Sequence, residues 1–280
     1  MFHVEQNNIH IKTRDYSFSN EEFAIIKTKT PGLLKTHPTP SMMSIKKYYD
    51  GDNYNSHKTK AVSIFDWVYN LFRIINTFFK VRCLGPLTTK DRILDYGCGT
   101  GYFLKSIIRR NYSIVGYEPI KKNDNPLIFS SLSSDKITNT RFTVVTAWHS
   151  LEHVHNIDKE LKNIFDITDS KSKVVVAVPN YNSLDAKYYK SFWAGYDVPR
   201  HIWHFNKKGI VELFKSHGFK KIRSAPMLLD AYYVSYLSER YKGRYLKIFR
   251  ALLVGTASNI HALFTGNFSS NVFTFKKINK

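Results

Sequence analysis

The sequence predicts a doubly wound α/β fold with a mostly parallel, seven-stranded sheet, and three observations support this prediction. Short apolar runs alternate with helical segments from residue 92 to residue 224. The run at residues 173–178 is almost wholly apolar, as a strand buried on both faces of a parallel sheet must be. A glycine-rich turn at residues 97–101 follows the first of these strands and opens a helix.

The elements of the sheet follow in chain order. Strands are expected at residues 92–95, 113–117, 127–132, 142–147, 173–178, 219–224 and 271–275. Helices are expected at residues 102–110, 152–167 and 207–216, and an aromatic-rich amphipathic helix is expected before the sheet at residues 59–81. Asn206 is the expected N-cap of the helix at 207–216, and Gly218 follows its end.

Two segments lie outside the alternating pattern. Residues 1–45 are polar and irregular, and Pro31, Pro38 and Pro40 interrupt any long helix, so we interpret them as an N-terminal extension. Residues 46–280 then form the main domain. Within it, residues 228–262 read as helices inserted before the last strand, where such an insertion could serve as a lid over a binding site.

Composition excludes several classes of protein. The chain has 280 residues, 43% of them hydrophobic and 15% aromatic, which suits a globular domain rather than a disordered one. The apolar stretch at residues 61–81 is interrupted by three charges, and the first residues do not form a signal peptide, so we expect a cytoplasmic protein. Two cysteines exclude a disulfide framework and a four-thiolate zinc site.

The net charge of +20 is spread along the chain, without a basic tail or arm. A nucleic-acid partner is therefore not expected. The excess favours an anionic substrate or a membrane surface, and the helix at 59–81 is the segment expected to make any peripheral membrane contact. The sequence gives no indication of the oligomeric state.

The glycine-rich turn predicts a cofactor site. Residues 95–101 read Asp-Tyr-Gly-Cys-Gly-Thr-Gly, and Glu118 ends the next strand, where a carboxylate can accept the hydroxyls of a ribose. A dinucleotide would also suit a Gly-x-Gly-x-Gly turn, but the acid at position 95 would repel a pyrophosphate. The same acid suits the positive ammonium and sulfonium groups of S-adenosylmethionine (SAM). The predicted cofactor-binding residues are Asp95, Gly97, Cys98, Gly99, Gly101, Glu118 and Trp148.

These residues resemble the SAM motif of class I methyltransferases, in the branch that includes the ubiquinone-biosynthesis O-methyltransferases. The resemblance covers residues 46–225 and extends to the segments at 148–154, 179–180 and 193–201. It implies a Rossmann-like fold, SAM as cofactor and methyl transfer as the reaction. Related chains often carry an N-terminal zinc-binding segment, but Thr28 and Pro31 stand here where thiols would be, and no metal site is expected there. Thr143 also stands where such chains have an aspartate.

Methyl transfer to a hydroxyl needs a base, and histidine is suited to this role near neutral pH. His149 and His153 follow the fourth strand, at the sheet edge where ligands bind, and His201 lies in a second polar cluster with Arg200 and His204. This second cluster could bind an acidic group of the substrate or orient an aromatic one, and the alternative is a solvated surface loop. We nominate His149, His153 and His201 as catalytic residues. The first two are four positions apart and share a helix face if that turn is helical. Together with Glu152 they also form a metal-ligand pattern, and the alternative is that Glu152 and His153 cap and pack the start of the helix.

Two functions remain open on the sequence. The first is methylation of a small-molecule acceptor, with an anionic or aromatic group, most plausibly at oxygen. The motifs that grip a nucleic-acid base in DNA methyltransferases are absent from the sequence. The second is a SAM- or nucleotide-binding protein without catalysis, which would bind a partner through the insertion at 228–262.

Overall fold

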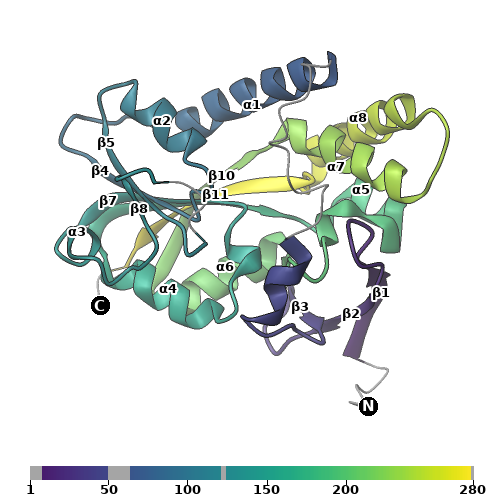
Figure 1. Cartoon of the computed structure of the whole chain (residues 1–280), viewed down its shortest axis with the longest axis horizontal. Helices are drawn as coiled ribbons and strands as arrows, with labels where there is room; N and C mark the ends of the chain where they lie inside the picture. Colours follow the sequence, from purple (N-terminus) through teal and green to yellow (C-terminus); the bar gives the residue numbers. More distant parts are fainter. Residues whose placement is uncertain (1–7, 50–63, 121–123, 279–280) are drawn as a thin grey trace. The chain divides into compact units, whose positions relative to one another are not determined.

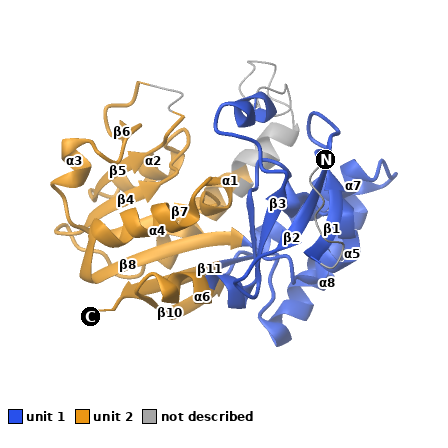
Figure 2. Cartoon of the chain, turned by 90° about the horizontal axis from the view of Figure 1, so that it is seen from below, with its two compact units in different colours: residues 1–63, 179–210, 226–271 blue, residues 64–178, 211–225, 272–280 orange. Residues whose placement is uncertain are grey.

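The computed structural model describes residues 8–49, 64–120 and 124–278. The chain divides into two compact units (Figure 2). Unit 1 comprises Met1–Ser63, Pro179–Ile210 and Pro226–Asn271, and unit 2 comprises Ile64–Val178, Val211–Ala225 and Val272–Lys280. This division does not follow the boundary after residue 45 that the sequence suggests.

Unit 2 is built on the predicted seven-stranded sheet (Figure 1). In spatial order its strands are β10 (Phe219–Pro226), β11 (Ser270–Lys277), β8 (Thr168–Pro179), β7 (Phe142–Trp148), β4 (Arg92–Tyr96), β5 (Ser113–Tyr117) and β6 (Ile128–Phe129). The pairs from β8 through β7, β4 and β5 to β6 are parallel. The strand predicted at 127–132 is shorter than expected, and the others lie close to their predicted positions.

Helices cover both faces of this sheet. They are α1 (Ile64–Cys83), α2 (Tyr102–Ile108), α3 (Asp135–Thr138), α4 (Ile157–Asp166) and α6 (Lys207–Ser216). In Figure 1, α1 and α2 lie on one face and α4 on the other. The predicted cap of α6 is confirmed, since the side-chain oxygen of Asn206 accepts the N–H of Gly209 at 2.9 Å. The first residues predicted for the helix at 59–81, up to residue 63, lie outside the described residues.

Unit 1 contains an antiparallel sheet that the sequence analysis did not predict. Its strands, in spatial order, are β1 (Ile9–Arg14), β2 (Glu22–Lys27), β3 (Leu33–His37) and β9 (Trp203–Phe205). The interpretation of residues 1–45 as irregular was therefore wrong. Thr28, where a thiol would stand in related chains, instead closes the β2–β3 turn by donating to the carbonyl of Leu33 at 2.8 Å.

The rest of unit 1 is helical. It contains the short helices η2 (Ser44–Tyr49), α5 (Leu184–Tyr189), η4 (Lys190–Phe192) and η5 (Ala194–Tyr196), and the pair α7 (Leu228–Tyr241) and α8 (Lys247–Thr265). The pair shows that most of residues 228–262 are helical, as expected, and their role as a lid stays a prediction. Asp185 at the start of α5 is fully buried and accepts hydrogen bonds at 2.7 Å from Trp193, Ser258 and Ser269, which fixes α5 against α8.

One described helix, Lys247–Thr265, is long and apolar enough to cross a bilayer if only its length and composition are considered. This helix was not predicted from the sequence, where the apolar stretch at residues 61–81 was taken as the longest. A single helix of this kind is weak evidence for a membrane span, because core helices and signal sequences share its composition.

Candidate active site

The glycine-rich loop of unit 2 begins where β4 ends. The backbone N–H groups of Gly97 and Cys98 both donate to the carbonyl of Tyr117, at 2.8 and 3.1 Å, so the end of β5 holds the loop. Gly97 has a φ of +71°, and a Cβ at this position would lie 2.4 Å from the Cβ of Ser150. Only glycine meets both the conformational and the steric requirement there.

The outer part of the loop is bare backbone. Nothing lies within 4 Å of the place that a Cβ on Gly99 would occupy, and its φ is +54°. Gly101, with a φ of +76°, is the residue before the first turn of α2. A ligand can therefore approach the loop backbone at Gly99 directly, as the glycine spacing predicts.

Asp95, the first residue of the motif, is buried, with 2% of its surface exposed. The hydroxyl of Thr146 donates to its Oδ1 at 2.7 Å. Burial raises the pKa of Asp95 to about 6, against the opposing effects of the Thr146 hydrogen bond and the positive charge of Lys80. A positive group of a ligand beside this carboxylate would favour its ionised form and would itself be stabilised.

Glu118 follows the end of β5 and turns back onto the loop. Its Oε2 accepts the N–H of Gly99 at 2.9 Å, and its Oε1 accepts the N–H of Ile120 at 3.2 Å. The structure thus brings Glu118 to the glycine-rich loop, as the second acid of the site. Acceptance of ribose hydroxyls by Glu118 stays a prediction.

Cys98 fills the space left by a glycine on the neighbouring strand. A Cβ on Gly116 would lie 2.5 Å from the Cys98 Sγ. Burial raises the pKa of the Cys98 thiol, with further contributions from the charges of Asp95 and Glu118. The thiol therefore stays protonated, and its place in the loop is that of a small packing residue.

Trp148 ends β7, beside the strand that carries Asp95. Its ring packs edge-on against Phe103 of α2 at 5.4 Å between centroids, and the Lys80 ammonium lies 5.2 Å from the ring centroid. The indole N–H is buried and has no hydrogen-bond acceptor among the described residues. Binding of the cofactor by Trp148 stays a prediction.

The residues around the loop fit SAM. Asp95 and Glu118 come from adjacent parallel strands, where Asp95 pairs in register with Gly116, two residues before Glu118. They supply negative charge for a sulfonium and an ammonium group, and Gly99 offers an open approach to the backbone. Thr146 and Ser150 were not predicted from the sequence, because their roles follow from the register of β4 with β7 and from the turn after β7.

His149 is the residue directly after β7 and adopts a φ of +52°. Its Nδ1 lies 3.3 Å from the Oε1 of Glu152, whose side chain is 1% exposed, while the His149 side chain is 30% exposed. Positive φ values are uncommon for residues with side chains and recur at functional sites. The structure therefore joins His149 and Glu152 as a pair at the carboxyl edge of the sheet.

His153 ends the short 3₁₀ turn η3 (Leu151–His153), and α4 begins only at Ile157. The helix predicted from residue 152 was wrong in its first turn. The left-handed backbone of His149 precedes this turn, and the extended backbone of Val154 separates the turn from α4. The expected helix face shared by His149 and His153 is therefore absent.

His201 lies in unit 1, where its Nδ1 donates to the carbonyl of Gly195 at 3.0 Å. A carbonyl only accepts, so the proton of the neutral ring is on Nδ1 and Nε2 carries the lone pair. His204 is buried beside Thr36, and burial lowers its pKa well below 6.5. His204 is thus a neutral core residue.

Arg200 is also internal, in contrast to the substrate-binding role considered from the sequence. It is 1% exposed, and its guanidinium donates to Asp15 at 2.8 Å, to both carboxylate oxygens of Asp197 and to the carbonyl of Tyr48 at 3.0 Å. These acceptors already engage the guanidinium. Arg200 therefore holds unit 1 together.

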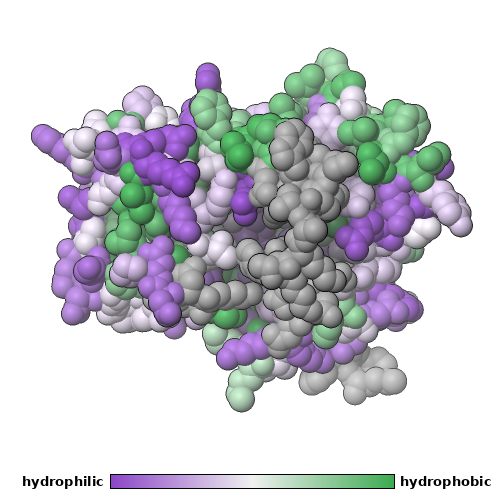
Figure 3. Space-filling view, turned by 45° about the horizontal axis from the view of Figure 1, so that its top comes forward, coloured by the Kyte–Doolittle hydropathy of each residue, from purple (hydrophilic) through white to green (hydrophobic). Residues whose placement is uncertain are grey.

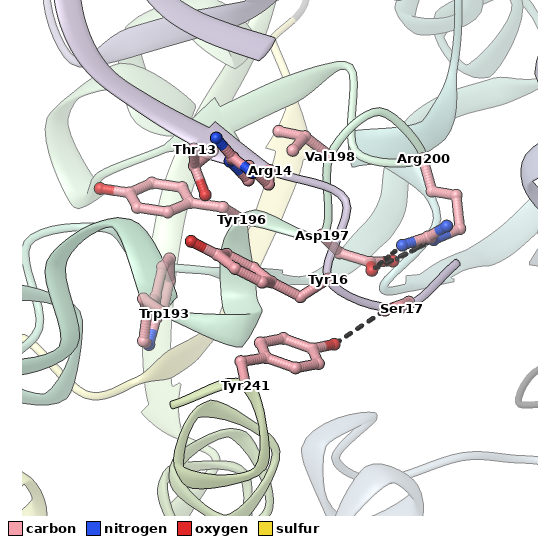
Figure 4. A pocket seen from close by; sticks show the side chains of 10 residues that line it. All are labelled: Thr13, Arg14, Tyr16, Ser17, Trp193, Tyr196, Asp197, Val198, Arg200 and Tyr241. Carbon is pink, nitrogen blue, oxygen red and sulfur yellow. Dashed lines mark hydrogen bonds and ion pairs between the residues drawn. The ribbon is translucent and has the colours of Figure 1, made fainter. Parts of the chain in front are cut away.

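A small pocket lies next to this ion pair, within unit 1 (Figure 4). Aromatic rings form much of its lining, and a hydrogen bond of 2.8 Å joins the hydroxyls of Ser17 and Tyr241. The rings are those of Tyr16, Trp193, Tyr196 and Tyr241. The pocket could not be predicted from the sequence, because part of its lining comes from residues 13–17, which were interpreted as irregular.

The parallel sheet and the acid-containing glycine loop together define a class I, Rossmann-like methyltransferase. Residues 69–224 match a family model described as a methyltransferase domain. The chain belongs to this family and is a SAM-dependent methyltransferase, which confirms the predicted fold, enzyme class and cofactor.

Solved structures share the fold. Magnesium protoporphyrin IX methyltransferase from Synechocystis PCC 6803 is 10% identical, with a TM-score of 0.53 over 85% of this chain and 100% of that chain. Phosphoethanolamine N-methyltransferase 2 from Haemonchus contortus is 15% identical, with a TM-score of 0.52 over 93% of this chain and 70% of that chain. A search of curated protein sequences gives no match.

Proposed function

We propose that the enzyme methylates an oxygen of a small-molecule acceptor, with His149 as the base that removes the hydroxyl proton. The observation that carries this proposal is the pairing of His149 with the buried Glu152 at the carboxyl edge of the sheet. A carboxylate on Nδ1 holds the imidazole in the tautomer whose Nε2 can accept a proton.

The residues of the site and the cofactor would have separate roles in the reaction. Bound SAM supplies a methyl group already activated on a sulfonium. Asp95 would hold the positive end of the cofactor, the open space beside the Gly99 backbone would admit it, and Glu118 fixes the loop. The remaining requirement for attack by a hydroxyl is a partner for its proton, and Nε2 of His149 provides one.

The nature of the acceptor draws on two kinds of support. The similar structures belong to proteins named for methylation of a porphyrin and of phosphoethanolamine, both small molecules. The sequence motifs resemble the ubiquinone-biosynthesis O-methyltransferases, which supports oxygen as the accepting atom. The engagement of Arg200 inside unit 1 removes one expected binding group for an acidic acceptor. His153 and His201 remain secondary nominees for the base.

A labelled-methyl assay tests the proposal. Extract fractions from a strain that lacks the protein are incubated with labelled SAM, and the product formed only on adding the enzyme identifies the acceptor. With that acceptor, His149→Gln should lower kcat by about 10²–10⁴-fold, the usual contribution of a general base, while the SAM Kd stays unchanged.

His217→Gln is the matched control, since His217 also pairs with a carboxylate in unit 2, at 3.2 Å from Asp158. It should leave kcat unchanged. A product methylated on nitrogen or carbon, or an unchanged kcat in His149→Gln, contradicts the proposal. Absence of product from every fraction, with SAM binding intact, contradicts it as well.

A further inference from the structure

Helix α8 presents its large apolar residues to the outside and its small residues to the protein. Six large side chains on one side of the helix are between 52% and 86% exposed: Ile248, Phe249, Leu252, Leu253, Leu263 and Phe264. These residues are called here the apolar face of α8. Figure 3 shows hydrophobic side chains gathered over this helix at the upper right. This arrangement is the reverse of an ordinary surface helix.

The opposite side of α8 is fixed to unit 1. Its buried residues are Ala251, Gly255, Ser258 and Ala262. A Cβ on Gly255 would lie 2.6 Å from the ring of Tyr232, and the Ser258 hydroxyl donates to the buried Asp185 at 2.7 Å. These contacts set the rotation of the helix, so its apolar face points outward as a built feature of the unit.

Positive charge surrounds the start of this helix. Five basic residues occur within eleven positions, at Arg240, Lys242, Arg244, Lys247 and Arg250, and no acidic residue occurs from 240 to 280. Tyr245, between them, is 92% exposed. Exposed apolar side chains beside lysine, arginine and tyrosine are the composition of helices that lie in the headgroup region of a membrane.

We propose that α8 binds the surface of an anionic lipid bilayer, with its apolar face in the interface and its basic end on the headgroups. The helix lies on the bilayer rather than across it, because its small-residue side is bonded to the body of unit 1. A second copy of the chain is a poorer occupant, since it would bring the same excess of positive charge to the same face. An anionic bilayer matches both the apolar area and the charge.

Co-sedimentation with vesicles tests this proposal. The full chain should bind vesicles of phosphatidylcholine mixed with phosphatidylglycerol, bind much less to phosphatidylcholine alone, and be released by salt. Leu253→Glu should weaken binding to the vesicles by on the order of tenfold or more, because a charge replaces an apolar side chain that the bilayer would bury. Lys247→Gln and Arg250→Gln should each weaken it about fivefold, the effect expected for one charge near an anionic surface.

Ile74→Glu is the matched control. Ile74 lies on α1, is 55% exposed, and belongs to the helix from which the sequence predicted membrane contact. This variant should bind vesicles like the wild type, and every variant should bind SAM normally, which shows that it is folded. Three results overturn the proposal: no preference for phosphatidylglycerol, loss of binding in Ile74→Glu instead of Leu253→Glu, or a dimer in solution that Leu253→Glu dissociates while vesicles bind neither form.

Discussion

Asp95 of unit 2 and Asp15 of unit 1 are both almost completely buried, but their surroundings differ. Asp95 accepts a hydrogen bond from the Thr146 hydroxyl, and no described lysine or arginine forms a salt bridge with it. Asp15 accepts hydrogen bonds from the Arg200 guanidinium at 2.8 Å and from the backbone N–H groups of a turn at 3.0–3.2 Å.

The difference separates a binding carboxylate from a structural one. A buried charge costs free energy unless partners compensate it, and the partners of Asp15 come from within the protein. Asp95 lacks a comparable set, and burial raises its pKa to about 6. Asp95 therefore remains available for a positive group of the cofactor. Replacing Asp15, in contrast, would destabilise the folded chain.

Arg200→Met provides the strongest test of this contrast. It leaves Asp15 buried without its cation, and we expect the free energy of unfolding to fall by about 3–5 kcal/mol in urea titrations. The double variant Asp15→Asn with Arg200→Met should recover part of this loss. Arg14→Met is the control, since the Arg14–Glu22 pair is exposed and is worth about 0–1 kcal/mol. Equal effects of Arg200→Met and Arg14→Met would show that the buried pair is not structural.

The pH dependence of the free energy of unfolding should reveal the raised pKa of Asp95. Its pKa is about 6 in the folded chain, above the ordinary value of 3.8, so the folded state binds more protons between these values. Ionisation of Asp95 should therefore lower the free energy of unfolding as pH rises from about 4 to 6, by about 3 kcal/mol in all. Above that range its effect should be constant.

Asp95→Asn removes this contribution while its amide oxygen can still accept the Thr146 hydrogen bond. Comparing the free energy of unfolding of both proteins at about pH 4 and at about pH 7 measures the difference. The same variant should bind SAM about tenfold or more weakly at neutral pH, since it lacks the negative charge. A more stable protein with undiminished SAM binding would remove Asp95 from the cofactor site.

How far the sequence predicts each unit depends on the range of its contacts. The central strands β4 and β7 and the second half of β8 are buried on both faces, so each one is a local apolar run, as in β8, where Val174 to Val178 are all buried. In unit 1, β1 has only one buried residue, and its polar residues conceal the strand. Strand β9 has three residues and pairs with β3, far away in the sequence.

The range of the contacts also decides which site residues can be predicted from the sequence. The glycine loop and Glu118 form a local motif with a fixed spacing, and the sequence predicts them. Thr146 reaches Asp95 only through the register of β7 with β4, and Arg200 reaches Asp15 across 185 positions. Neither contact can be recognised from the residues next to it in the sequence. For this reason Arg200 was interpreted from the sequence as a possible substrate-binding residue.

Two glycines allow the smallest and most selective test. A Cβ on Gly209 of unit 1 would lie 2.0 Å from the carbonyl oxygen of Gly32, whereas a Cβ on Gly99 of unit 2 would meet nothing within 4 Å. Gly209→Ala should therefore destabilise the chain by about 1–3 kcal/mol through overpacking and leave the SAM Kd unchanged. Gly99→Ala should cost only about 1 kcal/mol, because of its positive φ.

The larger substitution Gly99→Trp separates the two roles further. Its side chain projects from the exposed loop, so the thermal unfolding curve should stay close to that of Gly99→Ala, while calorimetry should detect no SAM binding. Undiminished binding in Gly99→Trp would place the cofactor elsewhere. Loss of SAM binding in Gly209→Ala would show that the packing of unit 1 controls the cofactor site, and the contrast between a binding unit and a structural unit would fail.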